Sequence, residues 1–249
     1  MAWPSTRLTE LLGIALPIIQ APMAGGPTTP ELVAAVSEAG GLGSIGAAGL
    51  QPDELRTAIR RVRELTSRPF AVNVFAQHER PEPEAAVVAA VDAVLAPLRR
   101  ELGLPEPARA GPLVPPYPLD ELLDVVVTER APVFSFTFGI PQLDAIRAGG
   151  ARILGTATTA AEAEVLERAG VDALVAQGSE AGGHRGTFAP GAGPQLVGTL
   201  ALVPQVVDRV GVPVVAAGGI ADGRGVAAVL ALGAAGAQIG TAFLPCPES

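Results

Sequence analysis

The fold is constrained most by a repeated alternation of short apolar runs with longer helix-forming stretches. Continuous apolar strands joined by helical crossovers indicate a parallel sheet that is buried on both faces. Eight such units favour a closed (β/α)8 TIM barrel over an open doubly wound sheet, so we predict this α/β fold. The expected strands are Pro17–Met23, Gly41–Gly46, Phe70–Phe75, Val133–Phe138, Arg152–Ala157, Ala173–Gln177, Val212–Ala217 and Ala237–Phe243.

The intervening stretches have the composition and end signals of helices, with Thr29 as a plausible N-cap before Pro30. The expected helices are Thr29–Ala39, Pro52–Thr66, Pro83–Leu102, Leu119–Arg130, Pro141–Ala148, Thr159–Ala169, Gln195–Val210 and Gly223–Leu232. We expect a single domain over residues 1–249, with residues 79–130 as an extended helical and proline-rich excursion between the third and fourth strands. The last strand ends close to the C-terminus, so a helix after the eighth strand is not expected.

Composition narrows the class of protein. Hydrophobic residues make up 49% of the chain and charged residues 17%, which is too apolar for a disordered protein. No stretch contains about 20 unbroken apolar residues, and the N-terminus lacks the pattern of a signal peptide. Cys246 is the single cysteine, so no intrachain disulfide can form. We therefore expect a cytoplasmic protein without a membrane partner.

Charge and residue usage exclude several kinds of chemistry. The formal net charge of −8 argues against a nucleic-acid partner. All 17 basic residues are arginine, and the absence of lysine excludes Schiff-base chemistry and P-loop nucleotide binding. The chain has only two histidines, His78 and His184, so a multi-histidine metal site is hard to build and none is expected.

Glycines after the seventh and eighth expected strands predict a phosphate site. Active sites of such barrels lie at the C-terminal ends of the strands, and phosphate sites are common after the last two. Gly218 and Gly219 let backbone amides approach an anion closely, and Gly240 and Thr241 offer further amides and a hydroxyl. The helix opened by Ile220–Gly223 adds an N-terminus that favours phosphate. The alternative is a purely structural role, in which these glycines only form tight turns.

Further residues at the expected barrel mouth suit a flavin ring. Asn73 and Gln177 can both donate and accept hydrogen bonds, which matches the pyrimidine edge of an isoalloxazine. Pro22 and Met23 offer an apolar platform for one face of the ring.

A histidine after the sixth expected strand could carry the chemistry. His184 follows the double glycine Gly182–Gly183, so its imidazole could abstract a proton or stabilise a developing anion. Glu180 could orient it or be a surface charge, and both alternatives stay open. His78 lies in a polar stretch and is expected to be solvated.

Six segments in order along the chain resemble the bacterial nitronate monooxygenases, also called 2-nitropropane dioxygenases. They are PIIQAPMAGG from Pro17, FAVNVF from Phe70, SFTFG from Ser135, QGSEAGGHRG from Gln177, AAGGIADG from Ala216 and QIGT from Gln238. The resemblance implies FMN as cofactor and His184 as the catalytic histidine. Residues argued above and those implied by the resemblance give one expected cofactor site: Pro22, Met23, Asn73, Gln177, Gly182, Gly183, Gly218, Gly219, Gln238, Ile239, Gly240 and Thr241.

The resemblance further implies oxidation of alkyl nitronates, or nitroalkanes, by O2 to a carbonyl compound and nitrite. The segments are shared with FMN-dependent enoyl-ACP reductase II, so that activity or an NAD(P)H:quinone reductase is the alternative. Thr137 stands where several relatives carry a second histidine. Family members usually continue beyond the QIGT strand with a last helix and a lid, so the chain is expected to lack both. A flavin-binding barrel without turnover is therefore a third possibility, and the oligomeric state is open.

Overall fold

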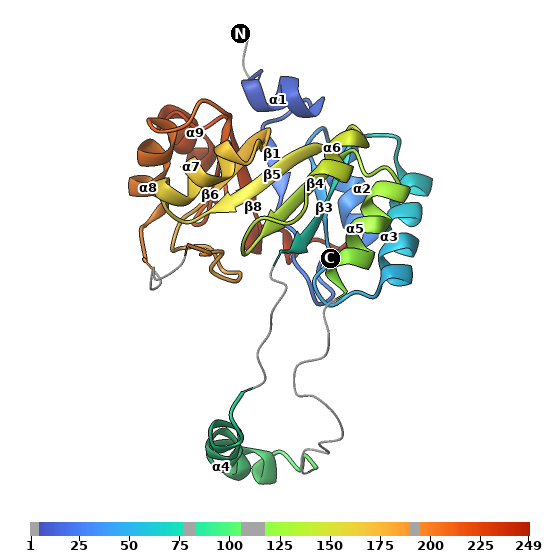
Figure 1. Cartoon of the computed structure of the whole chain (residues 1–249), viewed down its shortest axis with the longest axis vertical. Coiled ribbons are helices and arrows are strands. Elements are labelled where there is room, and N and C mark those ends of the chain that lie inside the picture. Colours follow the sequence, from blue (N-terminus) through green and yellow to red (C-terminus); the bar gives the residue numbers. More distant parts are fainter. Residues whose placement is uncertain (1–4, 77–82, 106–117, 190–194) are drawn as a thin grey trace. The chain divides into compact units, whose positions relative to one another are not determined.

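A computed structural model describes residues 5–76, 83–105, 118–189 and 195–249 of the chain. Its strands form one parallel sheet in the order β1-β8-β7-β6-β5-β4-β3-β2. A parallel bridge between Ile19 and Leu42 joins the two outer strands and closes the sheet. The predicted (β/α)8 TIM barrel is thereby confirmed (Figure 1). The strands are β1 Ile18–Gln20, β2 Gly43–Gly46, β3 Phe70–Phe75, β4 Val133–Thr137, β5 Arg152–Ala157, β6 Ala173–Gln177, β7 Val214–Ala217 and β8 Gly236–Ile239.

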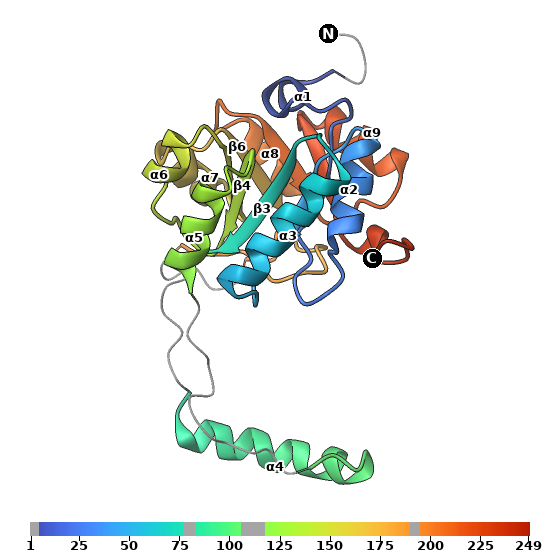
Figure 2. The same cartoon turned by 90° about the vertical axis from the view of Figure 1, so that its right-hand side faces the viewer.

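Helices cover the outer face of the barrel, as the alternating sequence pattern predicts. Figure 2 views the side on which α2 packs against β2 and β3. The helices are α1 Arg7–Leu12, α2 Pro30–Glu38, α3 Pro52–Leu65, α4 Ala85–Glu101, α5 Leu119–Thr128, α6 Asp144–Ala148, α7 Ala160–Arg168, α8 Thr199–Val207 and α9 Gly223–Ala231. A 3-10 helix, η1, covers Thr241–Phe243. The six-residue helix α1 was not predicted, because one and a half turns give too short a pattern to detect.

Several strands end earlier than the sequence predicted. The expected strand Ala237–Phe243 ends at Ile239, where Gly240 (φ −110°, ψ −81°) turns the chain into η1. The fourth strand ends at Thr137 because Phe138 has a φ of +70°, outside the extended region. After β8 the apolar run continues because Ala242 and Phe243 are partly buried against the cluster that contains α9, without joining the sheet.

Contacts divide the chain into two compact units. The first contains residues 1–77 and 118–249, which include the whole barrel, and the second contains residues 78–117. In the second unit α4 has no buried residue, although it carries an apolar stripe. His78 and residues 79–82 and 106–117 of the expected excursion lie outside the described residues. The single-domain interpretation stays a prediction.

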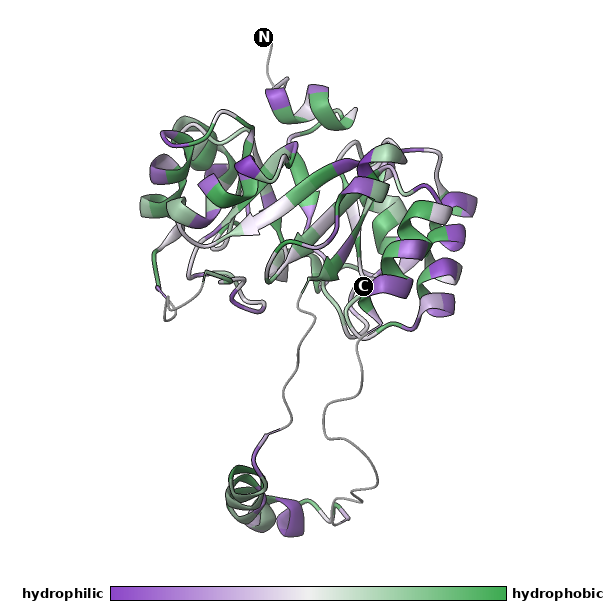
Figure 3. Ribbon diagram, in the orientation of Figure 1, coloured by the Kyte–Doolittle hydropathy of each residue, from purple (hydrophilic) through white to green (hydrophobic). Residues whose placement is uncertain are grey.

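The interior of the barrel is apolar at the N-terminal ends of the strands. Leu8 and Leu12 of α1 enter a fully buried cluster with inward side chains of the strands, including Ile19, Val133 and Val175. The Thr6 hydroxyl donates to the carbonyl of Ala235, just before β8, at 2.7 Å, which places α1 at this end. Figure 3 shows largely apolar strands, with hydrophilic residues on the outer side of helices such as α3. With this end closed by α1, the opposite end is left for a site.

A buried carboxylate joins the helices that cover β3 and β4. Glu129, 9% exposed, accepts hydrogen bonds from Arg56 at 3.2 Å and from Arg60 at 2.8 Å, and its second oxygen lies 3.4 Å from Arg63. The Arg60 hydrogen bond holds the pKa of this carboxyl below its ordinary value. Three arginines of α3 thus converge on one residue that follows α5.

Replacing Glu129 by Gln should lower the free energy of unfolding by roughly 1–3 kcal/mol at neutral pH, because three arginines lose the buried carboxylate that is their common partner. A lowered pKa contributes stability above the unfolded pKa and loses it as the pH falls through the folded pKa. The difference between wild type and variant should therefore shrink below about pH 4.5.

Urea unfolding at several pH values measures this difference. Glu64→Gln is the matched control, since its carboxylate pairs with Arg61 on the surface and should matter little. Equal stability losses in the two variants would contradict the assigned role of Glu129.

Candidate active site at the barrel mouth

The inward-facing residues at the C-terminal ends of the strands are polar. Neighbours in register share a face of the sheet, and Asn73 is in register with Ser135. The Asn73 amide donates to the Ser135 hydroxyl at 2.9 Å, and both side chains are buried. The polar layer consists of Asn73, Ser135, Thr137, Thr156, Gln177 and Gln238. The barrel interior therefore changes from apolar to polar towards the mouth.

Three loops meet at one side of the mouth. Gly218 and Gly219, after β7, have φ angles of +110° and +70°, which only glycine adopts readily. A Cβ on Gly182 would lie 2.9 Å from the Thr241 hydroxyl, so the loop after β6 reaches the chain after β8. Within the described residues, no acceptor is found for the backbone N–H groups of Gly218, Gly219, Gly240 and Thr241. These free donors form a cradle that suits an anion.

The N-terminus of α9 is already occupied, contrary to the expectation that it would bind phosphate. The Asp222 carboxylate accepts from the backbone N–H of Arg224 at 3.0 Å and of Gly225 at 3.2 Å. The Arg224 side chain pairs with the same carboxylate and lowers its pKa. An anion would therefore rely on the glycine amides rather than on the helix end.

His184 lies in an aromatic corner of the mouth. Its ring centroid is 5.3 Å from that of Phe75 and 6.1 Å from that of Phe138, with edge-on geometry in both pairs. Its imidazole has no hydrogen-bond partner within the described residues, and the residue is exposed. The corner is formed where β3 and β4 end, and Phe138 follows β4 in a left-handed backbone conformation. An imidazole held in this way is free to exchange a proton with a bound molecule.

The Gln177 side chain binds the loop that carries His184. Its amide nitrogen donates to the carbonyl oxygen of His184 at 2.8 Å, and its amide oxygen accepts from the N–H of Gly186 at 2.8 Å. One N–H and one lone pair of the amide are left for a ligand. Sequence reasoning gave Gln177 a cofactor role alone and missed this second one.

Glu180 is an exposed residue, as the surface-charge alternative expected, and its partly buried carboxylate also holds the start of a helix. Its carboxylate accepts from the backbone N–H of Thr199, the first residue of α8, at 2.8 and 3.0 Å, and lies 2.9 Å from the Thr199 hydroxyl. That hydroxyl is also 2.8 Å from the carbonyl oxygen of Gly218. Burial raises the pKa of Glu180, but these hydrogen bonds outweigh burial and lower it. Glu180 therefore caps α8 and supports the loop of Gly218.

The remaining expected residues differ in whether their side chains face the mouth. Pro22 and Met23 are half-buried at the mouth, where the Met23 N–H donates to the Thr28 hydroxyl at 2.9 Å. Gln238 faces inward, in register with Ile19 of the core cluster. The Ile239 side chain instead packs outward in a cluster with α9, so only its backbone can serve a site at the mouth.

Strand periodicity would have revealed residues that motif reading missed. Ser135 and Thr156 lie on the same face as Asn73 and Gln177 in a pattern that alternates every second residue. Thr137 is part of this layer, with its hydroxyl 3.4 Å from that of Thr156. No sequence signal indicates that Phe138 takes a positive φ.

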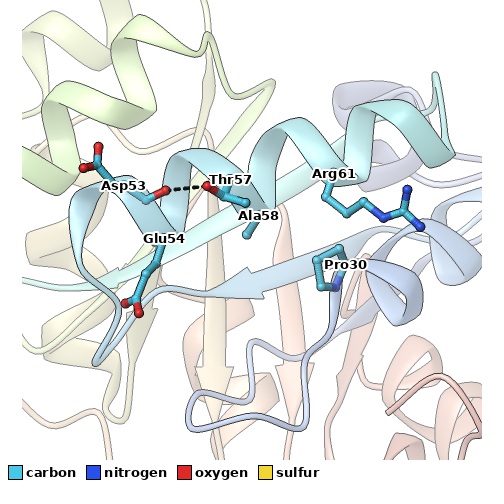
Figure 4. Close-up of a pocket in the computed structure, with 6 residues that line it drawn as sticks. All are labelled: Pro30, Asp53, Glu54, Thr57, Ala58 and Arg61. Carbon is cyan, nitrogen blue, oxygen red and sulfur yellow. Dashed lines mark hydrogen bonds between the residues drawn. The ribbon is translucent and has the colours of Figure 1, made fainter.

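A separate hollow lies on the outer surface between α2 and α3. It is lined by Pro30, Asp53, Glu54, Thr57, Ala58 and Arg61 (Figure 4). None of the expected site residues borders this hollow. The residues that line it belong to α2 and α3, and most of them are exposed to solvent. The barrel mouth therefore stays the candidate site.

Two further searches cover the described part of the chain. No group of three or more His, Cys, Asp or Glu side chains there could hold a metal ion. No helix there is both long enough and apolar enough to cross a membrane.

Comparison with known proteins links these features to a family. The family model described as "Nitronate monooxygenase" matches residues 5–249. A probable nitronate monooxygenase of Staphylococcus aureus is 47% identical over 99% of this chain and 70% of its own length. The structure of a nitroalkane oxidase from Streptomyces ansochromogenes has a TM-score of 0.85 and 44% identity, covering 98% of this chain and 70% of that one. FabK from Thermotoga maritima has a TM-score of 0.76 and 38% identity, covering 98% and 64%.

Inorganic phosphate should bind the glycine cradle weakly, and Gly219→Asp should abolish this binding because its carboxylate would face the anion. Chemical-shift changes of the amides of Gly219, Gly240 and Thr241 during a phosphate titration measure the binding. Asp tolerates the positive φ at this position.

Gly219→Asn is the matched control, since it has the same shape without the charge and should keep more of the phosphate response. If phosphate shifted these amides equally in the Asp and Asn variants, the cradle would not be an anion site.

Proposed function

Because the chain belongs to the nitronate monooxygenase family, we propose that it is an FMN-dependent enzyme that oxidises alkyl nitronates with O2 to carbonyl compounds and nitrite. Members of this family are flavin oxidoreductases, and the chain is an enzyme of this kind. One observation supports the proposal above all: His184 stands at the mouth without a hydrogen-bond partner of its own among the described residues, and a cradle of free amides shares that mouth. In the balanced reaction, two nitronate ions and one O2 molecule give two carbonyl compounds and two nitrite ions.

The residues at the mouth fit FMN. The free N–H groups of Gly218, Gly219, Gly240 and Thr241 suit its phosphate, which needs donors where the chain has no lysine. The Gly182 backbone lies so close to Thr241 that a side chain would fill the same space. The amides of Asn73, Gln177 and Gln238 suit the polar edge of the ring, and Pro22 and Met23 its apolar face. The flavin would supply electron transfer from the substrate to O2.

The protein's own part in the reaction is proton handling and placement of the substrate. The His184 imidazole can take a proton from the carbon next to a nitro group, or hold the negative charge of a nitronate when protonated. Phe75 and Phe138 form an apolar wall beside the imidazole, which suits an alkyl substituent and excludes water. Thr137 occupies part of the polar layer beneath.

His184→Gln should lower nitrite formation by about 10²–10⁴-fold, the usual contribution of a positioned acid or base. The flavin should be retained, because the cradle does not involve the imidazole. Nitrite release from propyl-1-nitronate and from propionate 3-nitronate measures the effect, with the flavin absorption spectrum as the test of cofactor binding.

His78→Gln is the matched control, since His78 is expected to be solvated and should leave the rate unchanged. Full nitrite release by His184→Gln would remove the histidine from the mechanism. A yellow wild-type protein that released no nitrite would support a flavin-binding barrel without turnover.

The similarity to FabK favours a second candidate, a reductase on the same barrel. That candidate is an FMN-dependent enoyl-ACP reductase or an NAD(P)H:quinone reductase. Rapid anaerobic reduction of the flavin by NADH, together with no nitrite from nitronates, would select it over the nitronate monooxygenase. We expect instead slow reduction by NADH and fast anaerobic reduction by nitronates.

Gly219→Asp should purify with less than about a tenth of the wild-type flavin content, because two negative groups would meet at the phosphate position. Gly219→Asn should retain more flavin under the same conditions. Absorbance at the flavin maximum, relative to protein, measures the content. Stoichiometric flavin in the Asp variant would place the phosphate elsewhere.

A further inference from the structure

We propose that Gln177 and Arg185 are positioning residues that clamp the backbone of His184 to the ends of β5 and β6. The inference rests on the proposed role of His184 as the catalytic residue. It assigns a task to Arg185 that the cofactor site does not include, and a second task to Gln177.

The Gln177 amide bridges two residues of the loop that carries His184. It donates to the carbonyl of His184 and accepts from the N–H of Gly186, both at 2.8 Å, so it brackets Arg185 between two hydrogen bonds. The amide belongs to the inward face at the end of β6, a rigid strand. The backbone at His184 is therefore fixed to the barrel and not only to its own loop.

Arg185 completes the clamp from the opposite direction. Its guanidinium donates to the backbone carbonyls of Gln177, of Gln195 at 2.6 Å and of Thr158 at 3.4 Å. These carbonyls come from the end of β6, the segment before α8 and the end of β5. The fork of an arginine can reach several acceptors at fixed angles, which lysine cannot do.

The cost of burying this cation indicates that its position matters. The Arg185 Nε is buried and has no hydrogen-bond partner in the described structure. Burial lowers the pKa of the guanidinium, and the nearby carboxylates of Glu162 and Glu180 act in the opposite direction. An arginine used only for solubility would keep its head group in water.

The later residues of the same loop are also held by hydrogen bonds to a buried side chain. Glu162 is fully buried, and its carboxylate accepts from the N–H of Phe188 at 2.7 Å and of Ala189 at 3.0 Å. Within the part of the chain that the structure describes, the imidazole of His184 has, by contrast, edge contacts with two phenylalanine rings and no hydrogen bond. Since such contacts allow sliding, the backbone clamp sets where the imidazole stands.

Gln177→Met tests the clamp, because it keeps the length of the side chain but removes both hydrogen bonds. We expect kcat to fall about 10- to 100-fold with KM within about threefold, since a displacement near 1 Å costs that much in rate. Activity is measured at saturating added FMN, so that weaker flavin binding is separated from displacement of His184.

Gln177→Glu supplies a signature that a merely structural role would not show. A protonated glutamic acid can donate to the His184 carbonyl and accept from Gly186, whereas the carboxylate cannot donate. Activity relative to wild type should therefore rise as the pH falls through the pKa of the new carboxyl. Arg185, Glu162 and Glu180 surround the position in both proteins, so the wild-type profile corrects for their effects.

A measurement that needs no turnover follows the imidazole itself. The chain has two histidines, so histidine-labelled protein in a His78→Gln background gives one set of imidazole signals. We expect sharp signals in that background and broadened or doubled signals after Gln177→Met or Arg185→Met. Arg209→Met is the control, since Arg209 is an exposed residue that pairs with Glu164 on the outer surface.

Unchanged imidazole signals and wild-type kcat in both clamp variants would overturn the proposal. Loss of flavin from Gln177→Met with wild-type kcat at saturating FMN would also overturn it, leaving Gln177 as a cofactor ligand only. If the signals change in the clamp variants while His184→Gln keeps full activity, the clamp stands and the proposed function of the histidine fails.

Discussion

Closure of the parallel sheet is the constraint on which the rest of this structure depends. Each strand of a parallel barrel points the same way, so the pairing of β1 with β8 and the bridge to β2 bring the C-terminal ends onto one rim. Residues far apart in the sequence, such as Met23, Gln177 and Thr241, share this rim for that reason alone. The direct pairing of β6, β7 and β8 brings the loops of the amide cradle together, and the curvature of the closed sheet brings the loop after β6 to Phe75 and Phe138 at the ends of β3 and β4.

The two ends of the barrel interior differ in polarity, and the apolar end stabilises the fold while the polar end contains the candidate site. At the N-terminal end, α1 and apolar strand residues form a dry cluster that needs no ligand. At the other end, Asn73, Ser135 and Thr156 face inward as a polar layer. Polar groups that are buried need partners, and several of these hydrogen-bond one another or the loops above. The polar layer therefore serves two purposes, since it supports the loops and leaves amide groups for a bound molecule.

Three carboxylates of this protein act on backbone amides. Glu162, Glu180 and Asp222 each accept from N–H groups at a loop or a helix start, and each has a lowered pKa. Arginines also act on the backbone: Arg185 donates to the carbonyl of Gln195, and Arg63 donates to the carbonyl of Arg130 as well as pairing with Glu129. Hydrogen bonds of these side chains thereby hold the loops at the mouth, which agrees with the proposal that the His184 imidazole handles the proton.

The sequence by itself determined the barrel, its strand count, the glycine turns after β7 and β8, and the histidine after β6. It could do so because buried strands, helical crossovers and glycine pairs leave local patterns that do not depend on distant contacts. Only the tertiary structure decided that Asp222 and Arg224 satisfy each other, that Glu180 caps α8, and that Gln177 holds the His184 loop. Each of these depends on which residue lies opposite a side chain across a loop or a neighbouring strand. A polar residue has several possible partners of similar energy, and the folded chain selects one of them through distance and burial.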